Sequence, residues 1–169
     1  RSFFFFWADG SSMFLRAASY HLNGVNYRTE FYRMEVARHR PKEHPMRIFK
    51  NKRFARFARK EGISDTTLCE VVRDAEAGRI DADYGGGVIK QRIARPGAGK
   101  SGGYRSVILY RHGDKAFFVY GFPKSERDSI DQAEERAFKE LAKLTLAFSD
   151  DEIRQLIKAG TYKELKNNG

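Results

Sequence analysis

A run of positively charged residues without any acid is the feature of this sequence best suited to chemistry on a phosphate. Between Val88 and Arg105 the cations are Lys90, Arg92, Arg95, Lys100 and Arg105. Lys90 and Arg92 lie two residues apart on a predicted strand, so their side chains project from one face. Arg105 begins the next strand and can approach that face, where cations could bind phosphates. A solvated surface is the alternative, although solvated surfaces usually mix both signs of charge.

A second cluster, at residues 120–128, closes a later strand and leads into a helix. Lys124 and Arg127 would lie near the first cluster if the sheet is contiguous. Tyr104, Tyr110 and Tyr120 could stack on bases, but tyrosines on strands more often serve as packing residues. The side chains predicted to contact nucleic acid are therefore Arg95, Lys100, Tyr104, Tyr120, Lys124 and Arg127.

The scarcity of histidine and cysteine excludes several kinds of active site. Residues 46–169 contain only His112, in a predicted hairpin turn, which excludes a ribonuclease with two catalytic histidines there. A Ser-His-Asp arrangement would require His112 to point inward. The single cysteine, Cys69, excludes an intramolecular disulfide and a zinc site with several cysteines. The other histidines, at positions 21, 39 and 44, match no metal-binding spacing, so we predict no metal site.

The glycine-rich loop at residues 95–103 resembles a nucleotide-binding P-loop only superficially. It contains Gly99-Lys100-Ser101, but the Walker spacing requires a glycine where this sequence has Ala94. The loop also opens a strand, whereas a P-loop opens a helix. We therefore predict no nucleotide and no other cofactor.

The composition indicates a basic, soluble protein. The chain has 169 residues, with 32 Lys and Arg against 22 Asp and Glu, and a formal net charge of +10. Such a charge points to a polyanionic partner, most simply nucleic acid. The longest apolar run, residues 3–8, is far shorter than the ~20 residues that a membrane span needs. We expect a cytoplasmic protein without a membrane partner.

From Met46 onward the sequence predicts a small α+β domain, residues 46–169. The expected order is one strand, two helices, three antiparallel strands and two helices, with the helices packed on one face of the sheet. The helices are expected to begin at Asn51, at Ser64 or Asp65, near Asp128, and at a capping box that starts at Ser149. The expected strands span residues 47–50, 88–94, 104–111 and 115–122.

Residues 1–45 are predicted to be an extension with weak structure of its own. They show no sustained hydrophobic period, and Pro41 and Pro45 oppose continuation of a helix. Lys42-Glu43 can be encoded as AAGGAG, a bacterial ribosome-binding sequence, two codons before Met46. We expect Met46 to be the natural start of translation, and the alternative is an ordinary basic linker.

The run GGGVIKQRIARPGAGKSGGYRSVILYR, followed by AFFVYGFPKSERDSI, closely resembles the RelE/HigB-like toxins of bacterial type II toxin–antitoxin systems. The likeness covers Met46 to about Leu165, and residues 1–45 do not share it. The resemblance implies a twisted antiparallel sheet with the N-terminal helices packed on it. It also implies an mRNA endonuclease that cuts in the ribosomal A site and is held inactive by a cognate antitoxin, which we expect to carry a helix-turn-helix domain.

Carried over residue by residue, the resemblance places the basic catalytic residues of RelE at Lys90, Arg92 and Arg105. We expect the side chains of Lys90 and Arg105 to be exposed on the sheet. In that chemistry the RNA 2′-OH attacks the adjacent phosphate, lysine and arginine stabilise the crowded phosphate, and a lysine can act as the base, without a metal. The sequence departs from RelE at two positions. RelE has an arginine where Ser125 stands, and its late tyrosine aligns near Asp131. Lys124, Arg127 or Tyr120 could compensate.

Two other functions remain open from the sequence. A toxin similar to ParE would share the fold and poison DNA gyrase by protein contact, without needing cations aligned on the sheet. A module that binds RNA or DNA without cutting it is the third class. The five cations between Val88 and Arg105 favour an RNA-cleaving toxin.

Overall fold

The computed structural model describes residues 21–22, 25–26, 46–95 and 103–166. The chain divides into two compact units, Arg1–Glu43 and His44–Gly169. In the first unit, β1 (His21–Leu22) and β2 (Val25–Asn26) pair as a short antiparallel ladder. The second unit holds the predicted cations and is described below.

The second unit begins with a strand and two capped helices. Strand β3 (Arg47–Asn51) leads directly into α2 (Lys52–Lys60), where the side chain of Asn51 accepts a hydrogen bond from the Phe54 amide at 2.8 Å. Ser64 caps α3 (Asp65–Glu76) in the same way, by accepting from the Thr67 amide. These caps satisfy amide groups that have no partner within the helix, and so they fix where each helix begins.

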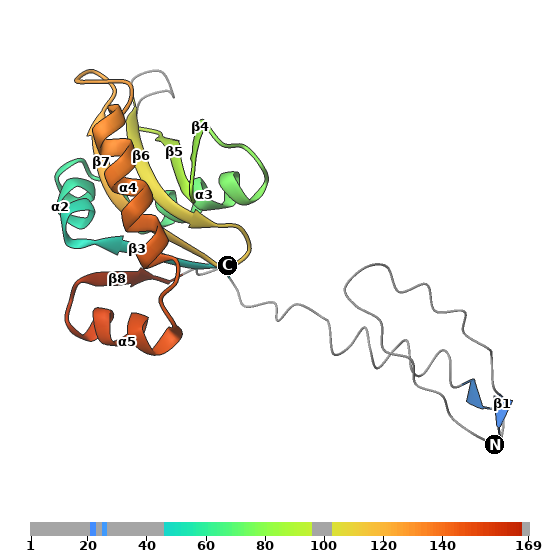
Figure 1. Ribbon diagram of the computed structural model, residues 1–169. Coiled ribbons are helices and arrows are strands. Elements are labelled where there is room, and N and C mark those ends of the chain that lie inside the picture. Colours follow the sequence, from blue (N-terminus) through green and yellow to red (C-terminus); the bar gives the residue numbers. More distant parts are fainter. Residues whose placement is uncertain (1–20, 23–24, 27–45, 96–102, 167–169) are drawn as a thin grey trace. The chain divides into compact units, whose positions relative to one another are not determined.

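The remaining strands join β3 in one six-stranded sheet of order β4-β5-β6-β7-β3-β8 (Figure 1). They are β4 (Ala82–Gly85), β5 (Val88–Ile93), β6 (Tyr104–Arg111), β7 (Lys115–Pro123) and β8 (Tyr162–Leu165). Neighbouring strands are antiparallel except β3 and β7, which run parallel. The turn between β6 and β7 is residues 112–114, as the sequence predicts.

Helices cover both faces of the sheet. On one face, α2 and α3 bury Phe54 and Leu68 against sheet residues that include Ile89 and Ile108. On the other, α4 (Gln132–Thr145) and α5 (Asp150–Lys158) bury Ala142 and Ile153. The sheet residues of that second core include Val88, Val107, Leu109 and Phe117. Figure 1 shows α4 lying over this face of the sheet, and its residues contact β5 and β6.

The α+β class is confirmed, and three details of the prediction are wrong. The helices pack on both faces of the sheet, because β6 and β7 carry buried apolar residues on both sides. Strands β4 and β8 were not predicted, since each has only four residues and lies at an edge. Helix α4 begins at Gln132 and not near Asp128, because Asp131 and Glu134 form a capping box there.

Candidate functional site

The predicted catalytic cations share one face of the sheet. In the β5–β6 ladder, Arg92 lies opposite Arg105 and Lys90 lies opposite Val107. Since side chains alternate along a strand, Lys90, Arg92 and Arg105 project from the face that carries Val107. This is the face that α4 and α5 cover. The structure therefore brings the three residues together, as the sequence predicts.

A carboxylate that the sequence analysis did not single out lies among these cations. Asp81 Oδ1 accepts a hydrogen bond from Arg92 Nε at 2.5 Å. Asp81 Oδ2 lies 3.8 Å from Lys90 Nζ and 3.8 Å from Arg105 Nε. Because Asp81 directly precedes β4, and Ala82 pairs with Lys90, the β4–β5 hairpin places this acid beside the cations. We call Lys90, Arg92, Arg105 and Asp81 the β5–β6 charge cluster.

The chain between β7 and α4 folds back over the same end of the sheet. Lys90 Nζ donates to the Asp128 carbonyl at 3.2 Å, and Arg105 Nη2 lies 3.4 Å from Asp128 Oδ1. Ile130 follows and is buried in the core beneath α4. As a result, the segment between β7 and α4 covers Lys90 and Arg105.

The expectation that Lys90 and Arg105 are exposed on the sheet is therefore wrong. Arg105 is 3% exposed, and the side chain of Lys90 is 12% exposed, whereas that of Arg92 is 61% exposed. Arg105 Nε is also buried without a hydrogen-bond partner among the described residues, since 3.8 Å to Asp81 is too long for a hydrogen bond. The Arg105 Nε–H is thus a hydrogen-bond donor that the described residues leave unsatisfied, which is unusual for a buried polar group.

The second cluster is built around Tyr120 and Arg127. The Arg53 guanidinium lies 4.4 Å from the centre of the Tyr120 ring, and that of Arg127 lies 5.1 Å from it. Phe138 stacks on the same ring, with centroids 6.0 Å apart. Arg127 also pairs with Glu134 at 2.8 Å, and this hydrogen bond lowers the pKa of Glu134 and raises that of Arg127. Tyr120 thus already stacks on protein groups, and Arg127 is already paired.

The remaining predicted contacts fall into three groups. Tyr104 is 3% exposed and meets Phe57 edge to face at 5.6 Å, so its ring is packed inside the protein and is not available on the surface for stacking. Arg95 and Lys124 are exposed, and the Lys124 amide donates to the Gly103 carbonyl at 3.2 Å, which places it beside the start of β6. Lys100 lies outside the described residues.

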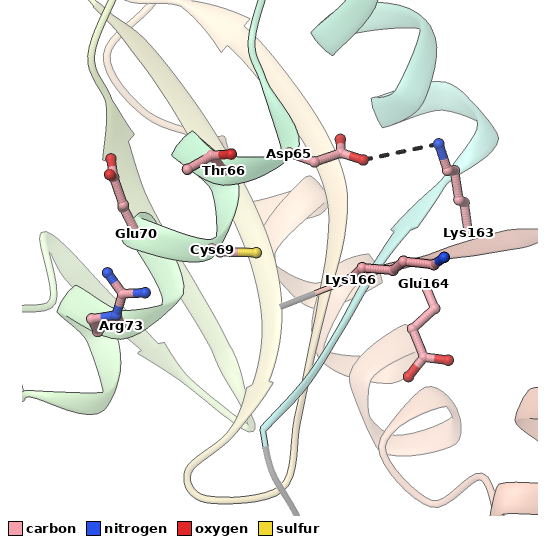
Figure 2. A pocket seen from close by; sticks show the side chains of 8 residues that line it. All are labelled: Asp65, Thr66, Cys69, Glu70, Arg73, Lys163, Glu164 and Lys166. Atoms are coloured by element: carbon pink, nitrogen blue, oxygen red, sulfur yellow. Dashed lines mark ion pairs between the residues drawn. The ribbon is translucent and has the colours of Figure 1, made fainter. Parts of the chain in front are cut away.

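A pocket lies elsewhere, between α3 and β8 (Figure 2), and has a volume of about 380 Å³. Its lining mixes both signs of charge, and Asp65 and Lys163 pair across it at 3.9 Å. Cys69, the free cysteine, also lines it. None of the predicted site residues lies in this pocket, and its mixed charges define no single class of ligand.

The part of the chain that the structure describes offers little support for a metal site, a catalytic histidine or a membrane span. No group of three potential metal ligands from His, Cys, Asp and Glu occurs among residues 46–95 and 103–166. His112 lies in the turn after β6, where its side chain is 73% exposed and its Nδ1 is 3.2 Å from Glu76 Oε1. This exposure is typical of a solvated histidine in a turn. The described helices include none that is long and apolar enough to cross a membrane.

Comparison with known families matches residues 46–165 to the RelE toxin of the RelE / RelB toxin–antitoxin system. The match covers most of the chain, which therefore belongs to the RelE toxin family. No curated protein matches the chain. A toxin of this family is one half of a toxin–antitoxin pair, so its partner is a cognate antitoxin.

Proposed function

We propose that this toxin is an endoribonuclease that cuts mRNA on the ribosome and thereby inhibits translation in the cytoplasm. The observation that carries the proposal is the convergence of Lys90, Arg92 and Arg105 on one face of β5 and β6. Guanidinium and ammonium groups bind oxyanions, here the Asp81 carboxylate, and the RelE family membership points to an RNA phosphate as the ligand that they would receive.

The proposed reaction needs charge and proton transfer. The 2′-oxygen of one nucleotide forms a bond to the adjacent phosphorus, the bond to the 5′-oxygen of the next nucleotide breaks, and a 2′,3′-cyclic phosphate remains. The proton of the 2′-OH leaves, and the 5′-oxygen gains one. Arg92 and Arg105 would stabilise the charge that develops on the phosphate. Lys90, the one primary amine in the cluster, is our candidate for moving a proton.

The second cluster would act beside this centre. Arg127, Tyr120 and exposed Lys124 are the residues that could serve where RelE has the arginine and tyrosine that this chain lacks. Because Tyr120 and Arg127 are occupied by Phe138 and Glu134, RNA would have to displace those contacts to use them. Lys124 and Arg95 are both exposed, although the Arg95 guanidinium lies 5.9 Å from the centre of the Tyr104 ring, and we propose that they contact the RNA backbone outside the cleavage position.

The cognate antitoxin should silence this surface. We expect it to be encoded beside the toxin gene and to carry a helix-turn-helix domain. Its binding would cover the β5–β6 charge cluster or keep the toxin out of the A site by bulk. Co-expression with the neighbouring gene should restore growth, and failure of every adjacent gene to do so would count against this pairing.

Translation in vitro with toeprinting tests the proposal against its alternatives. Purified toxin should produce new mRNA 5′ ends in translated regions and leave the same RNA intact without ribosomes. Intact mRNA together with inhibited supercoiling by DNA gyrase would instead support a gyrase poison. Intact mRNA with tight RNA or DNA binding, and no effect on gyrase, would support a module that does not cut.

A further inference from the structure

A hydrogen bond from its backbone amide, in addition to the contacts with the cations, holds Asp81 in place. Its amide donates to Gln91 Oε1 at 3.1 Å, and Gln91 Nε2 donates to the Arg79 carbonyl at 2.9 Å. Gln91 is itself 4% exposed and sits on β5 between Lys90 and Arg92. The strand that carries the two cations therefore also fixes the segment that carries the acid.

The Asp81 carboxylate contacts every cation of the cluster. One oxygen accepts from Arg92, and the other lies between Lys90 and Arg105. The side chain of Asp81 is 10% exposed and that of Arg105 is 4% exposed, so water screens these charges little. Without the carboxylate, three like charges would repel one another at close range, and their side chains would turn apart.

An RNA phosphate would need the same donors as Asp81. A phosphate, like a carboxylate, carries paired oxygens that accept from guanidinium and ammonium groups. Arg92 Nε is engaged by Asp81, whereas Arg105 Nε has no hydrogen-bond partner among the described residues. The negative charge of Asp81 should also repel a phosphate that approaches the same groups.

We propose that Asp81 is a positioning residue, which holds Lys90, Arg92 and Arg105 in the arrangement that receives the scissile phosphate. It speeds cleavage through the cations and weakens the binding of RNA in the ground state. This inference rests on the proposed endoribonuclease function. A purely structural role for Asp81 would not both speed cleavage and weaken RNA binding. These two opposite effects therefore distinguish the proposed role from a contribution to folding.

Asp81→Asn separates these effects, since it removes the charge and nearly preserves the shape. The maximal rate of mRNA cleavage on ribosomes should fall about 10- to 100-fold, because misplaced catalytic groups cost that much. The toxin concentration for half-maximal cleavage should stay unchanged or fall. Asp83→Asn is the matched control, because Asp83 is exposed on β4, two residues from Asp81, and its carboxylate accepts a hydrogen bond from the Gly85 amide. It should leave both quantities at wild-type values.

The arginine Nε–H signals in a ¹⁵N NMR spectrum report on positioning without any cleavage. In the wild-type protein the Arg92 signal should be displaced from those of solvated arginines and protected from exchange with water. Asp81→Asn should move it into the solvated group, and Asp83→Asn should not. An unchanged Arg92 signal in Asp81→Asn would overturn the proposal, and so would an unchanged maximal rate or a raised half-maximal concentration.

Asp81→Glu keeps the test decisive if Asp81→Asn does not fold. It restores the charge but moves the carboxylate by one methylene, so its maximal rate should fall between those of the wild type and Asp81→Asn, without a higher half-maximal concentration. A wild-type rate in Asp81→Glu would then refute the positioning role. If the wild-type toxin itself makes no cuts, the proposed function fails, and the NMR signals still decide whether Asp81 holds the cations.

Discussion

Arg92→Gln is the sharpest test of the proposed active site, because Arg92 is the exposed member of the β5–β6 charge cluster. Its side chain is 61% exposed, and its ion pair is with Asp81. Because the Asp81 side chain is only 10% exposed, loss of this hydrogen bond should lower the free energy of unfolding by about 1–3 kcal/mol, which leaves a folded protein for the cleavage assay. A charge-assisted contact to a phosphate contributes about 1.5–3 kcal/mol, which corresponds to a cleavage rate about 10- to 150-fold lower.

Arg154→Gln is the matched control for this experiment. Arg154 lies on α5, its side chain is also 61% exposed, and its ion-pair partner is Asp151. Both substitutions lower the net charge by one, so a difference between them reports on position. The assays are the cleavage rate on translating ribosomes, growth arrest on expression and the melting temperature. Wild-type cleavage by Arg92→Gln, or an equal loss in both variants, would refute our assignment of the site.

The burial of Arg105 makes its substitution a less direct test. Arg105→Ala would remove a side chain that is 3% exposed, and it would leave Asp81 with one fewer cation. Such a change destabilises the fold as well as the site, because it leaves a cavity and an underpaired acid. Loss of toxicity in Arg105→Ala would therefore have to be read beside its melting temperature.

Three further predictions concern the rest of the domain. The hydrogen bond from Arg127 lowers the pKa of Glu134, so the ion pair stabilises the protein above about pH 4.5. This stabilisation is lost as the pH falls through the pKa of Glu134 in the folded protein. Glu134→Gln should therefore make the free energy of unfolding less dependent on pH in that range. Gly121→Ala would place a methyl group 2.4 Å from the Phe57 ring, so urea unfolding should show a loss of about 1–3 kcal/mol. Removing residues 1–45 should leave the melting temperature and toxicity unchanged, and a large fall in melting temperature would show that this segment packs on the toxin domain.

The sequence predicts the helices best where their caps are local. Ser149 and Glu152 form the capping box that the sequence indicates for α5, because both partners lie within four residues. The start of α4 was misplaced because Ile130 continues the apolar spacing, although it lies before the helix and packs in the core. Local chemistry at Asp131 fixes that start, and the hydrophobic period alone does not show it.

The charge cluster could be predicted only in part. The spacing of Lys90 and Arg92 places both on one face, and the motif adds Arg105. The position of Asp81 among the cations depends on the β4–β5 hairpin. The sequence indicates this hairpin only through the glycines at residues 85–87, all three of which have positive φ angles. The burial of Arg105 depends on the chain before α4 returning to the sheet, and this contact spans 23 residues. No local pattern encodes such a contact.

Primer extension on two mRNAs that differ by one inserted nucleotide upstream tests the central claim most directly. A toxin that cuts in the ribosomal A site should move its cuts with the reading frame, so downstream cut positions should shift relative to the unchanged nucleotide sequence. The shift should disappear in Arg92→Gln along with cleavage. Cuts that remain at the same nucleotides in both mRNAs, or that occur without ribosomes, would contradict ribosome-dependent cleavage by this site.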